Sequence, residues 1–147
     1  MKKSIIILLI SLVSGISAFA KNEETVNKKV LSSFNKEFAT ATNTNWEVNR
    51  NYTKVTFVLN EQVLFGYYNA EGEKLAVIRN LRITQLPISL ATKVKKSYGN
   101  YWISDLFEVS TATETTYYIS VENAEQKITL KSDGTLGWTV FQKNDKE

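Results

Sequence analysis

Apolar residues in the first part of the chain recur at two different spacings. Those that lie four residues apart, as on one face of a helix, are Val26, Val30, Phe34 and Phe38. This pattern predicts a helix that Asn22 can cap and that ends in the polar stretch 40–45. From Trp46 the spacing changes to two, which predicts strands up to Leu59 and over 62–69 and 74–82, joined by tight turns.

The same order of elements follows a second time. Pro87 suits the first turn of a helix over 88–98, and strands are predicted over 101–110, 115–121, 126–131 and 136–142. The strands of the two halves align without a gap at an offset of 62 residues, and the helices at a slightly shorter one. This predicts an α+β fold, a tandem pseudo-repeat of helix plus antiparallel β-sheet with helices on one face, in halves 21–84 and 85–147. The alternative is a chance likeness of two amphipathic hairpins.

Hairpin geometry assigns each strand residue to one of the two faces of the sheet. In the first half, the face expected under the helix carries Val55, Phe57, Leu59, Leu64, Tyr68, Ala76 and Ile78. In the second half, it carries Tyr117, Ile119, Val121, Ile128, Leu130, Leu136, Trp138 and Val140. The opposite face of the second half has the composition of a solvated surface, with Ser120, Lys127, Thr129, Lys131 and Thr139 beside Tyr118 and Phe141.

The opposite face of the first half is too apolar to be an ordinary solvated surface. It carries Val63 together with the candidate partner-binding residues Tyr52, Val58, Phe65, Tyr67, Leu75 and Val77. Either another part of the chain covers this face, or the strand register differs by one residue, which would exchange the two faces. The hypothesis is that the face contacts a protein or peptide, with tyrosine and phenylalanine as anchors.

Two tryptophans lie just past the predicted helices. We expect Trp46 and Trp102 to hold comparable positions in the two halves and to pack a helix end against the sheet. Stacking of a sugar or another small ligand on these rings, in a cleft, is the functional alternative.

The first twenty residues have the composition of a secretory signal peptide. Lys2 and Lys3 precede an apolar run from Ile5 to Val13, and Ala18 and Ala20 are suitably small for cleavage after Ala20. A transmembrane anchor is the alternative, but Ser14, Gly15 and Ser17 cut the apolar run short. We therefore expect a periplasmic or secreted protein, with no membrane span and, for want of cysteine, no lipid anchor.

Composition excludes several kinds of chemistry. The 147 residues include no histidine and no cysteine, so we expect no His-dependent nucleophile, no disulfide, no zinc site of the usual kind and no cofactor. The formal net charge of +3 falls to +1 without Lys2 and Lys3, and the cluster Lys93, Lys95 and Lys96 suits a helix end, so nucleic acid is not expected as a partner. We find no carboxylate in an apolar strand, where burial would tune its pKa, so we do not expect an enzyme.

Several short motifs together resemble a known family. They are the helix with Phe34 and Phe38, the Asn45-Trp46 step, the strand Val55–Phe57, the turn Tyr68–Gly72, the Leu86-Pro87 step and the turn Ser132–Gly134. The chain resembles the PepSY-like, β-lactamase-inhibitor-like family of small exported proteins of Gram-negative bacteria. The resemblance implies a tandem α/β unit whose sheet presents a concave face opposite the helices. No inhibitory loop matches residue by residue, so inhibition is not implied.

We therefore expect an exported, non-catalytic module that binds a protein or peptide through its sheet. A binder of a small ligand or an envelope polymer, using Trp46 or Trp102, is the second possibility.

Overall fold

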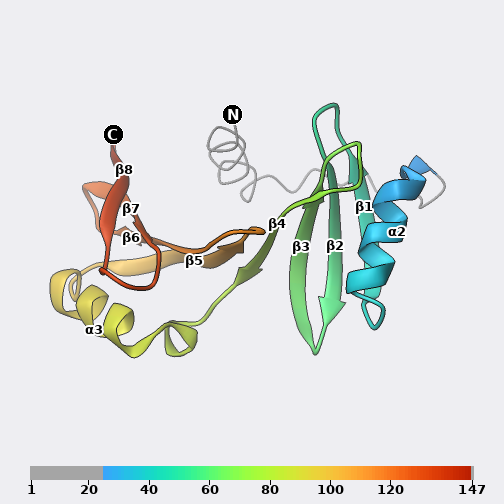
Figure 1. The fold of residues 1–147 in the computed structure, drawn as a ribbon. Helices are drawn as coiled ribbons and strands as arrows, with labels where there is room; N and C mark the ends of the chain where they lie inside the picture. The colour runs from blue at the N-terminus through green and yellow to red at the C-terminus, as the bar shows by residue number, and fades with distance from the viewer. Residues whose placement is uncertain (1–24, 147) are drawn as a thin grey trace.

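The computed structural model of the protein describes residues 25–146, which form a single antiparallel sheet with two α-helices (Figure 1). The first half contains α2 (Lys28–Glu37), β1 (Thr42–Val48), β2 (Thr53–Leu59), β3 (Gln62–Tyr68) and β4 (Lys74–Asn80). The second half contains the 3-10 helix η2 (Ile83–Gln85), α3 (Ile88–Ser97), β5 (Trp102–Ser110), β6 (Thr115–Glu122), β7 (Gln126–Ser132) and β8 (Thr139–Asp145). The eight strands lie in the sheet in chain order, so the α+β fold with an antiparallel sheet is confirmed.

The first helix begins later than its apolar spacing predicts. The side chain of Asn27 accepts a hydrogen bond from the backbone N–H of Lys29, at 2.8 Å, and so caps α2. The same side chain donates to the carbonyl of Ala70 and ties the helix start to the β3–β4 turn. The predicted cap, Asn22, and the predicted signal peptide lie outside the described residues.

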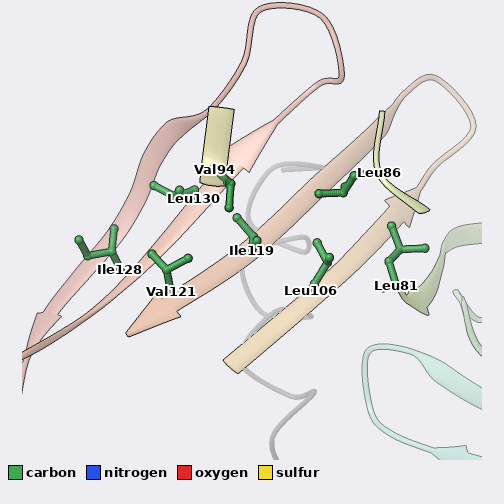
Figure 2. Packing of buried hydrophobic residues seen from close by; sticks show 8 residues of the cluster. All are labelled: Leu81, Leu86, Val94, Leu106, Ile119, Val121, Ile128 and Leu130. Atoms are coloured by element: carbon green, nitrogen blue, oxygen red, sulfur yellow. The ribbon is translucent and has the colours of Figure 1, made fainter. Parts of the chain in front are cut away.

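Both helices pack on the same face of the sheet. The cross-strand neighbours Leu64, Arg79, Glu108 and Tyr117 share one face from β3 to β6. Leu64 packs in the cluster beneath α2, and Tyr117 packs in the cluster beneath α3. The α2 cluster is rich in aromatic residues, with Phe34 edge-on to Trp46 and Phe57. The α3 cluster is mainly aliphatic, as Figure 2 shows.

The helix-side positions of the two halves correspond in two blocks. From Val26 to Trp46, each buried position has a counterpart 60 residues later, so that Phe34 corresponds to Val94 and Trp46 to Leu106. In the β2–β3 and β6–β7 hairpins, aligned at their turns, the offset is 64, and Val55 corresponds to Ile119. The difference arises because the β5–β6 hairpin is longer than the β1–β2 hairpin. The gapless strand alignment at an offset of 62 is wrong, because it does not superimpose the turns of the two hairpins.

Three residues predicted to lie under the helices do not lie there. Ala76 and Ile78 belong to a cluster on the other face, because a bulge at Tyr67 and Tyr68 shifts the β3–β4 register. Leu136 is 88% exposed, because β8 starts only at Thr139 and Leu136 lies outside the strand. Val140 is on the predicted face, since it pairs with Leu130, but it is 62% exposed in the edge strand β8. Trp138 packs as predicted, and its indole N–H donates to the carbonyl of Leu90.

Candidate contact face opposite the helices

The sheet face opposite the helices, called here the helix-free face, has its own buried cluster. The cluster contains no helix residue and extends from β3 to β6; its buried members are Tyr67, Ala76, Ile78, Phe107, Val109 and Tyr118. Around it lie the partly buried side chains of Tyr52, Phe65, Leu75 and Phe141. Since neither α2 nor α3 covers this cluster, the strands' own side chains bury its centre.

The structure places five of the six candidate partner-binding residues on the helix-free face. Tyr52, Phe65 and Leu75 are partly buried and pack around the cluster. Val58 lies opposite Val63, which is 47% exposed. Tyr67 is on this face but only 1% exposed, so its ring packs beneath the exposed side chains and is not accessible to a partner. Val77 is on the helix side, because it pairs with Gly66 and Ser110, and its predicted place on the helix-free face is wrong.

Electrostatics around Tyr67 follow from its burial. Its ring lies 5.6 Å from that of Tyr52, and burial raises the pKa of Tyr67 well above its ordinary value, with the Tyr52 hydroxyl and Glu47 adding to the effect. Glu47 itself accepts from Lys54 at 3.0 Å. The Tyr67 hydroxyl is therefore neutral at physiological pH.

The same face in the second half is less polar at its centre than predicted. Tyr118 is 1% exposed, stacks on Phe107 and meets Phe141 edge-on. Burial raises the pKa of Tyr118 to about 12, with a smaller contribution from Glu114. Ser120 is also buried and shares a hydrogen bond with Thr129 at 3.0 Å. The prediction of a solvated surface is wrong here because β5 brings Phe107 beside Tyr118.

The hairpin tips are where the two halves of the helix-free face differ most. Val58 and Val63 face each other at the tip of the β2–β3 hairpin, and the corresponding pair in β6–β7 is Glu122 and Lys127, joined at 3.2 Å. Lys146 also binds Glu122, at 2.7 Å. Hydrogen bonds from Lys146 and Ser104 lower the pKa of Glu122 to about 2. An apolar tip in one half thus replaces an ionic one in the other.

The expectation that no carboxylate lies in an apolar strand is wrong for Glu108. Glu108 is 9% exposed in β5 and accepts two hydrogen bonds from Arg79 of β4, at 2.9 and 3.0 Å. The bidentate guanidinium of Arg79 neutralises Glu108. The two residues thus form an ion pair between β4 and β5, where the two halves of the sheet meet, a junction called here the seam. Its position between the apolar residues Leu106 and Val109, with an arginine in the preceding strand, was a usable signal in the sequence.

The two tryptophans do not hold comparable positions. Trp46 is 2% exposed in the α2 cluster, and its indole N–H is buried without a hydrogen-bond partner among the described residues. Trp102 is 53% exposed at the start of β5, with the Lys146 ammonium 4.6 Å from its ring centre. Trp46 therefore cannot stack on a ligand without local opening, and Trp102 has one ring face occupied by a lysine.

The described residues hold no group of three or more acidic side chains that could bind a metal ion. Within residues 25–146, neither helix has the length and hydropathy to cross a membrane.

Comparison with solved structures shows the fold. A DUF2874 family protein from Bacteroides ovatus has a TM-score of 0.72 and 17% identity, over 82% of this chain and 88% of that one. A BLIP-like protein from Bacteroides fragilis has a TM-score of 0.70 and 19% identity, over 88% and 89%. A Bacteroides eggerthii protein, named for an expected periplasmic location, has a TM-score of 0.70 and 13% identity, over 80% and 87%. No family model and no curated protein matches this chain.

The resemblance to β-lactamase-inhibitor-like proteins is thus confirmed at the level of the fold.

Proposed function

We propose that this protein is an exported, non-catalytic module that binds a protein or peptide through the first-half part of its helix-free face. The observation that carries the proposal is the apolar pair Val58 and Val63, at the tip where the second half has the ion pair Glu122 and Lys127. Val63 lies two residues before the partly buried Phe65 on the same face of β3, and these side chains form an apolar surface beside the charged Lys54. Such surfaces are typical of protein contacts.

The fold comparison supports this proposal without naming a partner. BLIP-like and DUF2874 proteins share the arrangement, and a fold is compatible with many functions, so the choice of face rests on the residues. The wide, open character of the face suits a protein or peptide better than a small ligand, which needs an enclosed site.

The test transplants the second-half tip into the first half. Val58→Glu with Val63→Lys introduces the cross-strand pair that β6–β7 already accommodates, so the double variant should fold. Crosslinking in the native cell envelope, followed by identification of the linked protein, should recover a partner with the wild type. We expect its recovery to fall at least about tenfold in the double variant, because the apolar contact becomes charged.

The control introduces a charge on a different surface. Ile88→Lys changes an aliphatic residue that is 86% exposed at the start of α3, and it should leave partner recovery unchanged. Equal recovery from wild type and the folded Val58→Glu, Val63→Lys variant would overturn the proposed face.

Export is the second part of the proposal. It rests on the pattern of residues 1–20 and on the name of the Bacteroides eggerthii protein. The mature N-terminus, measured by mass spectrometry, should be Lys21. An N-terminus at Met1 in the cytoplasmic fraction would contradict this.

We further propose that the two halves are copies of one unit of a helix and four strands. The matching core positions at offsets of 60 and 64 support this.

A further inference from the structure

A second feature of the sheet lies apart from the helix-free tip, where β4 and β5 diverge. The last β4–β5 pair is Asn80 with Phe107, and Leu81 N–H then donates to the carbonyl of Leu106 at 2.8 Å. Beyond this point the chain leaves the sheet towards η2, while β5 continues to its start at Trp102 (Figure 1). Among the described residues, Trp102 to Asp105 therefore have no strand on the β4 side.

The divergence encloses a shallow hollow of about 530 Å³, called here the notch. One wall is Leu81, Arg82, Ile83 and Thr84, and the other is Ile103, Ser104, Asp105 and Leu106. Ile103 is 43% exposed although it is aliphatic. Ser104 lies in a bulge and has no partner in the β6 register. The notch thus combines aliphatic walls with a free strand edge.

The charges at the notch are unequal. Asp105 is engaged by Lys127 at 3.1 Å, in the network that also contains Glu122 and Lys146. Arg82, on the opposite wall, is exposed and has no ion pair among the described residues. The unneutralised charge is therefore positive, which favours a ligand with a carboxylate.

The shape of the notch favours a chain end. At its apex the hydrogen bond between Leu81 and Leu106 ends the free edge of β5, so an extended chain that pairs with this edge can extend no further along β5. Of the two kinds of chain end, the carboxylate suits Arg82, whereas an ammonium group would be repelled by it. The aliphatic walls suit an aliphatic last side chain.

We propose that the notch binds the C-terminus of a partner polypeptide, with an aliphatic final side chain between Ile83 and Ile103 and the terminal carboxylate on Arg82. The site is separate from the helix-free tip and does not rest on the function proposed above.

The probe is a pool of acetylated tetrapeptides with three randomised positions and a final Leu, Ile or Val that carries a free carboxylate. Binding is followed by NMR through the backbone amides of Ile103–Leu106 and the indole N–H of the neighbouring Trp102. We expect saturable shifts at these positions. The same pool with a C-terminal amide should bind about tenfold more weakly, as the loss of a charge-assisted hydrogen bond predicts.

Two variants complete the test. Arg82→Gln should weaken the carboxylate pool to the level of the amide pool, and Arg50→Gln, at an exposed arginine of the β1–β2 turn, should change nothing. A pool that is otherwise identical but ends in serine should bind the wild type more weakly than the aliphatic pool, and Ile103→Ser should remove this difference while thermal unfolding stays cooperative. The proposal is overturned if Ile103–Leu106 do not shift with the carboxylate pool. It is equally overturned if the amide pool, or an amidated pool with an internal Asp, binds as well as the carboxylate pool.

Discussion

The helix sides of the two halves bury corresponding positions with side chains of different size. In the α2 cluster, Phe34 of the helix packs with Trp46 and Phe57 of the sheet. The corresponding residues of the α3 cluster are Val94 of the helix and Leu106 and Val121 of the sheet. The first half has no side chain at Gly66, the position that corresponds to Leu130 in the second half. A Cβ atom at Gly66 would lie 2.9 Å from Val55 Cγ1 and 3.2 Å from the Tyr68 ring, so these two side chains leave no room for one at position 66.

The comparison shows that one backbone arrangement is filled in two ways. Protein cores reach nearly constant packing density, so a large residue at one position demands a small one at a neighbouring position. The aromatic filling beneath α2 concentrates the packing in a few rings, whereas the aliphatic filling beneath α3 distributes it over many smaller contacts. Substitutions that delete or add volume should therefore affect the two halves unequally.

The largest difference is expected for the helix residue that faces the sheet. Phe34→Ala should lower the free energy of unfolding by about 3 to 5 kcal/mol. Val94→Ala, at the corresponding position, should cost about 1 to 3 kcal/mol because it removes two methyl groups. Urea denaturation followed by circular dichroism measures both values. Equal losses would show that the two clusters do not differ as described.

The next test adds a side chain at Gly66, where the first half has none. Gly66→Ala should cost about 1 to 3 kcal/mol, since the new methyl group meets Val55 and Tyr68. The same substitution in a Tyr68→Ser background, which introduces the counterpart residue Ser132, should cost less. A double-mutant cycle by urea denaturation gives the coupling, and a value near zero would exclude steric compensation between Gly66 and Tyr68.

Substitutions in the Arg79–Glu108 ion pair of the seam should change the free energy of unfolding by a smaller amount. Glu108→Gln should cost about 1 to 2 kcal/mol, less than for a fully buried pair, because the Arg79 side chain is 37% exposed. The loss should largely disappear in an Arg79→Met background, where no guanidinium is left unpaired. If Glu108→Gln costs the same with and without Arg79, the pair does not stabilise the seam.

The smallest effect concerns acid sensitivity at the ionic tip of the second half. The folded pKa of Glu122 is lowered to about 2 from an ordinary value of 4.5, so its contribution to stability is present above pH 4.5 and is lost as the pH falls towards 2. Relative to wild type, Glu122→Gln should be less stable at pH 6 and equally stable near pH 2. Thermal unfolding between pH 2 and 6 measures this. A constant difference over that range would contradict the assigned pKa.

The elements of the fold could be predicted from the sequence because their spacing is regular. Val30, Phe34 and the alternation of Val55, Phe57 and Leu59 carry a strong periodic signal, and the helix-free position of Phe65 follows from the two-residue turn. The strand faces that could not be predicted depend on β-bulges, which produce no periodic pattern in the sequence. The bulge at Tyr67 and Tyr68 moved Ala76 and Val77 to the faces opposite those expected.

The candidate site was predictable only in part, for the same reason. Val58, Phe65 and Tyr52 were placed on the helix-free face from the first hairpin alone, and the structure puts them there. Burial of Tyr67 and Tyr118 depends on strands that meet across the seam, and pairing between β4 and β5 follows from no local pattern. The notch depends on the same pairing and was not foreseen.

The strand order of the sheet also bears on how the chain reaches its fold. Every strand pairs with its neighbours in the sequence from β1 to β8, so the sheet contacts are local for an eight-stranded structure. Folding rates fall as the sequence separation of contacts grows, and hairpins joined in chain order keep that separation small. The sheet can therefore form hairpin by hairpin from its N-terminal strand, before the C-terminal strands are available to pair.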